Sequence, residues 1–318
     1  PLACMNFLMN QDNLRVGSIN ANGLRTKDRR RAMLRQFKSH ADIICIQETF
    51  ADGALMKDIS FEFPGFWINS NARSHHSTGT AIGVFNVKSF KRQENDDYVD
   101  DYGRMAGLAL KHSSGENFYI LSLYAPCCDK STQNENYAFL VKASLKMFEM
   151  RDKGYTVLTG GDLNCLRDES IDARNGGEAF PQQQDWFNQL EASGNFFDIH
   201  RFNNPGVNLE TWSHGKRNSL ERFRRLDYFL APRSILERVE SIRTVPTLSD
   251  HRLLVMTIGR KRDKAKGIGM WRHNDRALND EEYCSKIEDT IRPSTYTYPR
   301  PPYTNVEFVV NLLPHQHN

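Results

Sequence analysis

The sequence has few cysteines, no long apolar run and little net charge. Its six cysteines among 318 residues form no Cys-x-x-Cys pair and no regular spacing, which argues against a disulfide framework and a cysteine-rich zinc site. No stretch reaches the length of a membrane span, and the first residues lack the basic and apolar segments of a signal peptide. We therefore expect a protein of a reducing compartment with no membrane partner.

The net charge of +3 is too small to indicate a nucleic-acid partner by itself. Its distribution is more informative, because residues 25–38 and 215–225 are rich in Lys and Arg and contain one acid each. An apolar content of 39% with 19 Phe is sufficient for a sizeable core. The length allows one large domain or two ordinary ones.

The most informative segment is residues 158–164, Leu-Thr-Gly-Gly-Asp-Leu-Asn. Alternation in an extended chain places Asp162 and Asn164 on one face, at the end of a predicted buried strand. The glycines would let the backbone approach a phosphate closely, and the acid could hold Mg²⁺ or take a proton from water. The same pattern also fits a polar loop after a core strand.

Four other segments place a polar residue at the end or flank of a predicted strand. Asn20 ends the first apolar run, Glu48 follows the second, Asp227 begins a later one, and Asp250 and His251 precede the last. In a sandwich of sheets, polar residues at several strand ends can converge on one cleft.

The ordered set Asn, Gln-Glu, Tyr, Gly-Asp-x-Asn, Asp and Asp-His resembles the DNase I-like endonuclease/exonuclease/phosphatase family. Within that family it is similar to the endonuclease domain of LINE-type non-LTR retrotransposons. The resemblance covers about residues 15–259, the expected catalytic domain. It implies an α/β fold built as a four-layer α/β/β/α sandwich, whereas periodicity alone predicts only two packed sheets with helices outside. Residues 260–318 are expected to be a basic linker and a poorly ordered tail.

Periodicity predicts helices over 28–39, 132–151 and 184–192. It predicts strands over 15–21, 42–47, 66–69, 80–86, 104–111, 118–123, 155–158, 210–213, 225–230, 239–244 and 253–258.

Glu48 is the best candidate for a metal ligand, because a carboxylate offers a hard oxygen to hard Mg²⁺. Read alone, it also fits a solvated strand end. The resemblance implies that Asn20 lies beside Glu48 and positions the metal or a phosphate, and that Asp250 belongs to the carboxylates on the metal side. We expect Mg²⁺ as the cofactor, with Mn²⁺ as an alternative.

The resemblance also implies the catalytic roles. Asp162 would orient or deprotonate the attacking water, and Asn164 would bind the same phosphate. Asp227 would hold the imidazole of His251, so that the charged ring can donate to a phosphoryl oxygen. Whether Asp162 or His251 is the general base stays open.

Tyr124 matches the phosphate-contacting tyrosine of the family, although a strand-end aromatic that packs on the sheet fits the local sequence equally well. The loop 215–224 is expected between two strands. In the retrotransposon enzymes a comparable loop enters a DNA groove. The side chains expected to contact phosphates and the narrow minor groove are Lys216, Arg217, Arg222 and Arg224.

Three functions compete. The first is a Mg²⁺-dependent retrotransposon endonuclease acting in the nucleus, which nicks one strand of double-stranded DNA and leaves a 3′-hydroxyl that primes reverse transcription of the element RNA. The second is an abasic-site repair endonuclease, but those enzymes have Asp where this chain has Asn22 and an aromatic where it has Arg224. The third is an inactive nucleic-acid-binding remnant of a retrotransposon protein.

Overall fold

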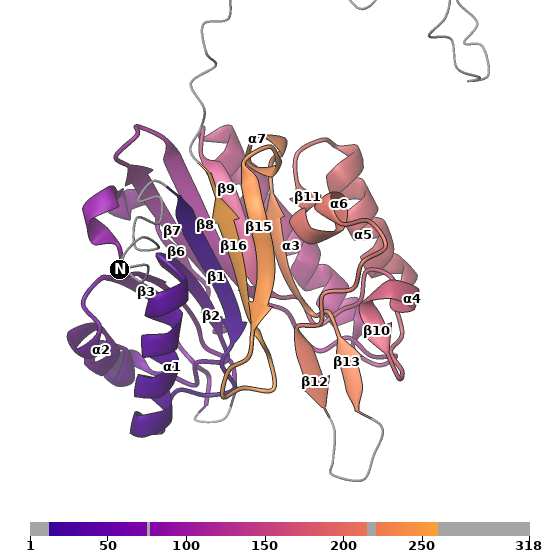
Figure 1. The fold of residues 1–318 in the computed structure, drawn as a ribbon, viewed down its shortest axis with the longest axis horizontal. Coiled ribbons are helices and arrows are strands. Elements are labelled where there is room, and N and C mark those ends of the chain that lie inside the picture. Colours follow the sequence, from indigo (N-terminus) through magenta and orange to yellow (C-terminus); the bar gives the residue numbers. More distant parts are fainter. Residues whose placement is uncertain (1–12, 75–76, 215–220, 260–318) are drawn as a thin grey trace, which may run out of the picture. The chain divides into compact units, whose positions relative to one another are not determined.

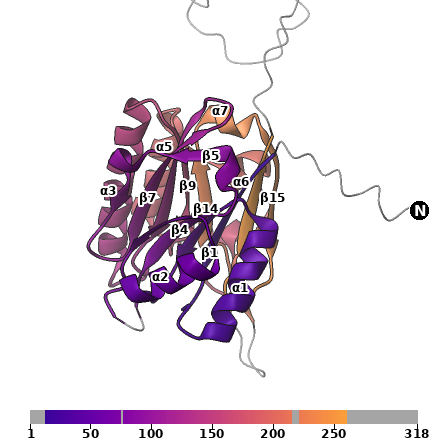
Figure 2. The ribbon, with the colours of Figure 1, turned by 90° about the vertical axis from the view of Figure 1, so that its left-hand side faces the viewer.

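The computed structural model describes residues 13–74, 77–214 and 221–259. These residues form two β-sheets packed face to face, with helices on both outer faces (Figure 1; Figure 2). The predicted α/β class and four-layer sandwich are confirmed. Lys216, Arg217 and residues 260–318, for which we made sequence predictions, lie outside the described residues.

The first sheet has the strand order β15-β16-β1-β2-β4-β3. Its central pair, β1 and β2, is parallel, and the other neighbours are antiparallel. The strands are β1 (Leu14–Asn20), β2 (Ile43–Gln47), β3 (Phe66–Ser70), β4 (Thr80–Val84), β15 (Val239–Val245) and β16 (Leu253–Ile258).

The second sheet has the order β11-β14-β9-β8-β7-β5, with β6 paired to β7. Here β8 and β9 are the parallel pair. The strands are β5 (Phe90–Arg92), β6 (Tyr98–Val99), β7 (Met105–His112), β8 (Asn117–Tyr124), β9 (Thr156–Asp162), β11 (Phe197–Asp198) and β14 (Asp227–Ala231).

Long helices cover each outer face. α1 (Lys27–His40) and α2 (Gly53–Glu62) pack on the first sheet, and α3 (Gln133–Asp152) and α5 (Pro181–Ala192) pack on the second. Shorter helices are α4 (Glu169–Asp172), α6 (Ile199–Asn203), α7 (Arg233–Leu236) and the 3₁₀ turns η2 (Val87–Ser89) and η3 (Glu94–Asp96). Within the described ranges, none of the helices combines the length and apolar character that a bilayer span requires.

The hydrophobic core between the sheets is made of strand residues from both. Cys45 and Ile82 of the first sheet lie in one buried cluster with Leu108, Ile120 and Phe229 of the second. Every residue of β2 is buried, which agrees with its continuous apolar sequence. Because this shared core packs the two sheets against each other, the ends of their strands are held at fixed positions relative to one another.

A small third sheet projects from the sandwich (Figure 1). It consists of β10 (Ala173–Arg174), β12 (Trp212–His214) and β13 (Arg222–Arg224). The sequence prediction was wrong here, because residues 222–224 were assigned to a loop. In this short strand the buried Phe223 alternates with Arg222 and Arg224 on either side. A single apolar residue between two charged ones is too short a pattern to predict a strand.

Candidate active site

Polar residues at strand ends of the two sheets meet at one edge of the sandwich. Tyr124 ends β8 and pairs with Asp162 at the end of β9, which in turn pairs with Asp227 at the start of β14. Asn20 ends β1 of the opposite sheet. The register therefore aligns three of the predicted site residues across neighbouring strands and presents the fourth to them from the other sheet.

Asp227 and His251 form a buried pair. Nδ1–H of His251 donates to Oδ2 of Asp227 at 2.8 Å, and the two residues are 1% and 5% exposed, respectively. Burial lowers the pKa of His251, but the negative charge of Asp227, with Asp162 and Asp250 behind it, outweighs burial and raises the pKa to about 10. The imidazole is therefore a cation at neutral pH, with Nε2–H as its free donor.

Asp162 lies opposite that donor. Its Oδ2 is 3.8 Å from Nε2 of His251 and accepts a hydrogen bond from Nδ2 of Asn20 at 2.9 Å. Oδ1 accepts from the backbone N–H of Asn164 at 2.9 Å. Burial raises the pKa of Asp162 to about 7; the charge of His251 opposes this shift and that of Asp227 adds to it. A carboxylate with a pKa near neutrality is suited to accept a proton from water.

Glu48 is joined to the same cluster through Asn20. Its Oε1 accepts hydrogen bonds from Nδ2 of Asn20 at 2.9 Å and from the phenol of Tyr124 at 2.7 Å, whereas Oε2 receives none from the described residues. Burial, followed by the charge of Glu48, raises the pKa of Tyr124 far above its ordinary value. The phenol therefore keeps its proton at physiological pH and can donate it in a hydrogen bond.

The cluster offers a few oxygen ligands, which suits Mg²⁺. Its described residues do not offer the complete set of protein ligands that a structural metal site requires. In the described part of the chain, no group of three or more His, Cys, Asp or Glu side chains is placed to hold a metal ion. Mg²⁺ does not need such a group, since one or two carboxylates, water and substrate phosphates complete its shell. The free Oε2 of Glu48 meets that requirement. Asn20 orients Glu48, while its own Oδ1 accepts from the backbone of Asn22 at 3.0 Å.

Asp250 lies beside this cluster and not inside it. Its carboxylate accepts from Nδ2 of Asn22 at 3.2 Å and from Nε1 of Trp212 at 3.0 Å. Burial raises the pKa of Asp250, but the positive charge of His251 and these two hydrogen bonds lower it by more. The net pKa therefore lies below the ordinary value. Asp250 therefore stays ionised at neutral pH, and it is connected to the cluster through Asn22.

Three of the site residues have backbone conformations that side chains rarely adopt. The φ angles of Asn22, Glu48 and Asn164 are 46°, 47° and 51°. Asparagine tolerates this left-handed region, but it is unusual for glutamate and costs energy. Such strain is concentrated at functional sites, where the surrounding structure fixes a side chain in a demanding position.

The comparison with known families agrees with this arrangement. Residues 13–251 match the model of the Endonuclease/Exonuclease/phosphatase family. The chain belongs to that family. Its members are DNase I-like hydrolases of phosphate esters that generally use divalent metal ions, and the family resemblance drawn from the sequence is confirmed.

Solved structures show the same fold at low sequence identity. An AP endonuclease from Leishmania major is 18% identical with a TM-score of 0.66, covering 78% of this chain and 88% of its own. The endonuclease domain of TRAS1, a telomere-specific non-LTR retrotransposon, is 16% identical with a TM-score of 0.55, covering 78% and 100%. The 3′ phosphatase NExo from Neisseria, bound to product DNA hairpin, is 15% identical with a TM-score of 0.60, covering 78% and 100%. Among curated protein sequences, none matches this chain.

In this family member the paired glycines before Asp162 serve packing. We expected them to admit a phosphate, but both lie inside β9. A Cβ on Gly161 would overlap the carbonyl oxygen of Leu123 on the neighbouring strand, and one on Gly160 would contact Phe229 and Ser18. The glycines therefore let the strands and sheets approach closely enough to align Asp162 with its neighbours.

Asn164 and the two described arginines of the small sheet occupy different environments. The Asn164 amide donates to the carbonyl of Ala125 at 2.9 Å, so it also fixes the chain beyond Tyr124. Arg222 is exposed, and the Arg224 guanidinium lies 5.4 Å from the centre of the Trp212 ring.

Sequence reasoning missed Trp212 and Arg104 as neighbours of the site. Trp212 forms an isolated β-bridge with His251 as well as the hydrogen bond to Asp250. Arg104 lies with its guanidinium 5.0 Å from the Tyr124 ring centre and donates to the Tyr124 carbonyl at 3.2 Å. A tryptophan in the polar segment 211–214 was the one available signal; for Arg104 the sequence offered none.

Proposed function

We propose that this protein is a Mg²⁺-dependent DNA endonuclease that nicks one strand of double-stranded DNA for a non-LTR retrotransposon. The observation that carries the proposal is the continuous cluster in which Asn20 joins Glu48 to Asp162, opposite the charged pair of His251 and Asp227. The cluster offers a base, a cationic donor and a metal-binding oxygen at one edge of the sandwich. The fold of the TRAS1 endonuclease domain, matched over its whole length, supports the retrotransposon assignment.

In the proposed reaction Asp162 accepts a proton from the attacking water, and the water oxygen forms a bond to phosphorus. The bond between phosphorus and the 3′ oxygen breaks, and that oxygen takes a proton from a solvent water to become the 3′-hydroxyl. The phosphate, which now carries the oxygen of the attacking water, stays on the 5′ side. His251 donates through Nε2–H to a phosphoryl oxygen as negative charge grows in the transition state. The hydroxyl of Tyr124, which donates its one proton to Glu48 in this structure, would turn from Glu48 to a phosphoryl oxygen when the substrate binds. Mg²⁺ bound through Glu48, with Asn20 and Asp250 nearby, would supply positive charge at the phosphate and the leaving oxygen.

This division of roles follows from the two pKa shifts. His251, with a pKa raised to about 10, holds its proton at neutral pH and is a poor base. Asp162, with a pKa of about 7, exchanges a proton readily in the same range. These values favour Asp162 over His251 as the general base.

An abasic-site repair endonuclease is the second candidate, supported by the likeness to the Leishmania major AP endonuclease. The surface beside His251 argues against it. There the Arg224 guanidinium covers Trp212, whose indole N–H is bound to Asp250. A pocket for a bare sugar needs apolar walls, whereas this surface is charged and hydrogen-bonded. The inactive remnant is disfavoured because all the matched catalytic positions are filled and linked.

Nicking of supercoiled plasmid tests the proposal, with Mg²⁺, with EDTA, and with the Asp162→Ala variant. We expect nicks on undamaged plasmid that cluster at particular sequences, carry 3′-hydroxyl and 5′-phosphate ends, and disappear with EDTA or in the variant. Cleavage confined to a duplex with an abasic site would assign the protein to repair. A folded sample that cuts neither DNA would leave the inactive binding remnant as the remaining candidate.

Two further points rest on this proposal. The 3′-hydroxyl would prime reverse transcription of the element RNA, bound through other parts of the element's protein, and the reaction would take place in the nucleus. Primer extension from mapped nicks and localisation of the tagged protein in cells test the two points separately.

A further inference from the structure

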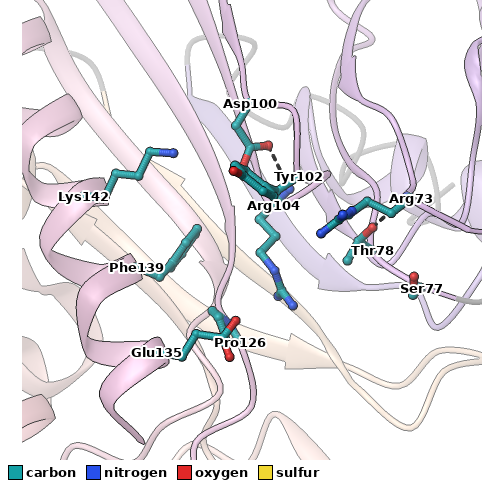
Figure 3. Close-up of a pocket in the computed structure, with 10 residues that line it drawn as sticks. All are labelled: Arg73, Ser77, Thr78, Asp100, Tyr102, Arg104, Pro126, Glu135, Phe139 and Lys142. Carbon is teal, nitrogen blue, oxygen red and sulfur yellow. Dashed lines mark hydrogen bonds between the residues drawn. The ribbon is translucent and has the colours of Figure 1, made fainter. Parts of the chain in front are cut away.

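A hollow of about 510 Å³ lies next to Tyr124 and is rich in positive charge (Figure 3). Its lining comes from the segment after β3, the connection from β6 to β7, and α3. Arg104 links it to the candidate active site, because the same guanidinium lines the hollow and lies over the Tyr124 ring. The volume is in the range of sites that hold small molecules or nucleotide units.

The centre of the hollow is an exposed aromatic ring between cations. Tyr102 is 53% exposed. Arg73 and Lys142 point toward it from opposite sides (Figure 3), with their charged groups 5.5 Å and 5.6 Å from the ring centre. An exposed aromatic ring interleaved with cations is the arrangement that binds single-stranded nucleic acid.

The three cations are available for a ligand. Among the described residues, Arg73, Arg104 and Lys142 form no ion pair. Of the two acids in the lining, Asp100 is 8% exposed and its Oδ1 accepts three hydrogen bonds, from Ser70 Oγ and from two backbone N–H groups. The second acid, Glu135, is exposed on α3. Three cations against these two acids leave the lining with one net positive charge.

We propose that this hollow binds one unpaired nucleotide of the DNA substrate, with its base stacked on Tyr102 and its phosphates paired with Arg73, Arg104 and Lys142. The inference rests on the proposed function and adds a substrate feature to it, namely an unpaired strand beside the scissile phosphate. A base in an intact duplex has both faces covered by its neighbours, so only an unpaired or unstacked base can reach the ring. A base that stacks on Tyr102 displaces one cation from the ring, and that cation then pairs with the phosphate.

The first test measures affinity by fluorescence anisotropy of the full chain in EDTA, where no strand is cut. Three labelled probes are compared. One duplex has an unpaired thymidine tail at the 3′ end of a strand, the second has the tail at the 5′ end, and the third has the tail paired. We expect wild type to bind one tailed duplex about fivefold or more tighter than the paired one, the lower end for one base–aromatic stack. Tyr102→Ala should remove this preference and Tyr102→Phe should keep it.

Phe61→Ala is the matched control, since Phe61 is a 90% exposed aromatic on α2, and it should leave the preference unchanged. A thermal melt of each variant verifies folding. In the double variant Arg73→Ala with Lys142→Ala, the slope of log Kd against log salt for the tailed probe should fall by about 0.7 for each phosphate that the protein no longer neutralises.

The outcomes separate this inference from the function on which it rests. A wild type that nicks plasmid but shows no preference for either tail, or a Tyr102→Ala variant that retains it, would overturn the nucleotide site alone; the hollow would then serve paired DNA at most. A folded wild type that neither binds nor nicks DNA would overturn both proposals.

Discussion

Oδ2 of Asp162 lies 3.8 Å from Nε2 of His251. The pKa values of the two residues are shifted by different causes. Burial dominates for Asp162 and raises its pKa, whereas the Asp227 charge overcomes burial for His251. As a result, the Asp162 carboxylate can gain a proton near neutral pH, whereas the His251 ring opposite it stays protonated. At the scale of single residues, this difference supports the proposed roles of Asp162 as base and His251 as donor, which the sequence left open.

Replacing Asp162 by Ala is expected to lower single-turnover nicking by at least about a hundredfold, since a positioned general base contributes that much or more. Glu48→Ala and His251→Ala should have effects of similar size. Circular dichroism and thermal melts should show folded proteins. Full activity in Asp162→Ala would refute the mechanism.

The pair of Asp227 and His251 is expected to act as one unit. Asp227→Asn removes the charge that raises the pKa of His251, so the ring should lose its proton at lower pH than in wild type. Single-turnover rates should fall by about 10² to 10⁴ in Asp227→Asn and in His251→Ala, and little further in the double variant. NMR titration of His251 measures the pKa directly; strictly additive rate losses would contradict the coupling.

At the scale of elements, the small sheet carries Arg222 and Arg224, two of the four basic residues expected to contact DNA. The residue that follows β13 connects this sheet to the rest of the domain. Arg225 follows β13, is 1% exposed, and lies between two carboxylates. It donates to Asp172 at 2.7 and 3.0 Å and to Asp198 at 2.8 and 3.0 Å. The last arginine of this basic stretch is therefore structural, and it fixes the chain two residues before Asp227.

Replacing Lys216 and Arg217 together by Ala is expected to change cleavage-site preference or affinity more than chemistry. These residues belong to the segment between β12 and β13 and lie outside the described residues. Phosphate contacts contribute to binding and register without touching the reacting atoms. Single-turnover rates at saturating DNA should stay near wild type while the pattern of nicks changes. A loss as large as that of Asp162→Ala would refute this separation.

Asp198→Asn is expected to destabilise the fold by about 3 kcal/mol, because it leaves Arg225 buried with one of its two partners. Asp152→Asn removes an exposed partner of Arg151 and should cost less than about 1 kcal/mol. Urea denaturation of both variants measures the difference. Equal effects would contradict the structural role of the buried network.

The ion pair of Asp198 and Arg225 also predicts how the stability of the fold depends on pH. Burial raises the pKa of Asp198, but Arg225 and Arg167 outweigh it, and the net pKa lies below the ordinary value of 3.8. A depressed pKa gives stability that is present above the ordinary value and is lost as pH falls through the lower folded value. The stability gap between wild type and Asp198→Asn should therefore shrink below about pH 4.

At the scale of the whole molecule, two sheets clamped by one core hold the strand ends that carry the site. The family match ends at residue 251, and β16 completes the first sheet at Ile258. We expect a fragment of residues 13–259 to fold cooperatively and to nick plasmid at a rate within about threefold of the full chain. Thermal melts and the nicking assay measure both. A fragment that fails to fold would show that residues 1–12 or residues 260–318 are required.

The sequence was sufficient for the family, because its motifs stand in a fixed order at strand ends, and strand ends can be recognised from apolar runs that stop at polar residues. It was also sufficient for most strands and for the three long helices α1, α3 and α5. It missed α2, whose hydrophobic pattern is short, and β13, whose arginines resemble a loop. It also missed the strands of two or three residues β5, β6, β10 and β11. Short elements carry too few residues for periodicity to separate them from loops.

The amino-acid sequence by itself determined which chemical groups the candidate site contains, since each motif residue could be named from its position at the end or flank of a predicted strand. Only the tertiary structure decided how those groups act on one another. Asn20 reaches Asp162 across 142 positions of chain, and Arg104 and Tyr102 lie together with Lys142 because β7 packs near α3. Such contacts depend on strand register and sheet packing, which set distances and burial and hence pKa values, and no local pattern of residues encodes them.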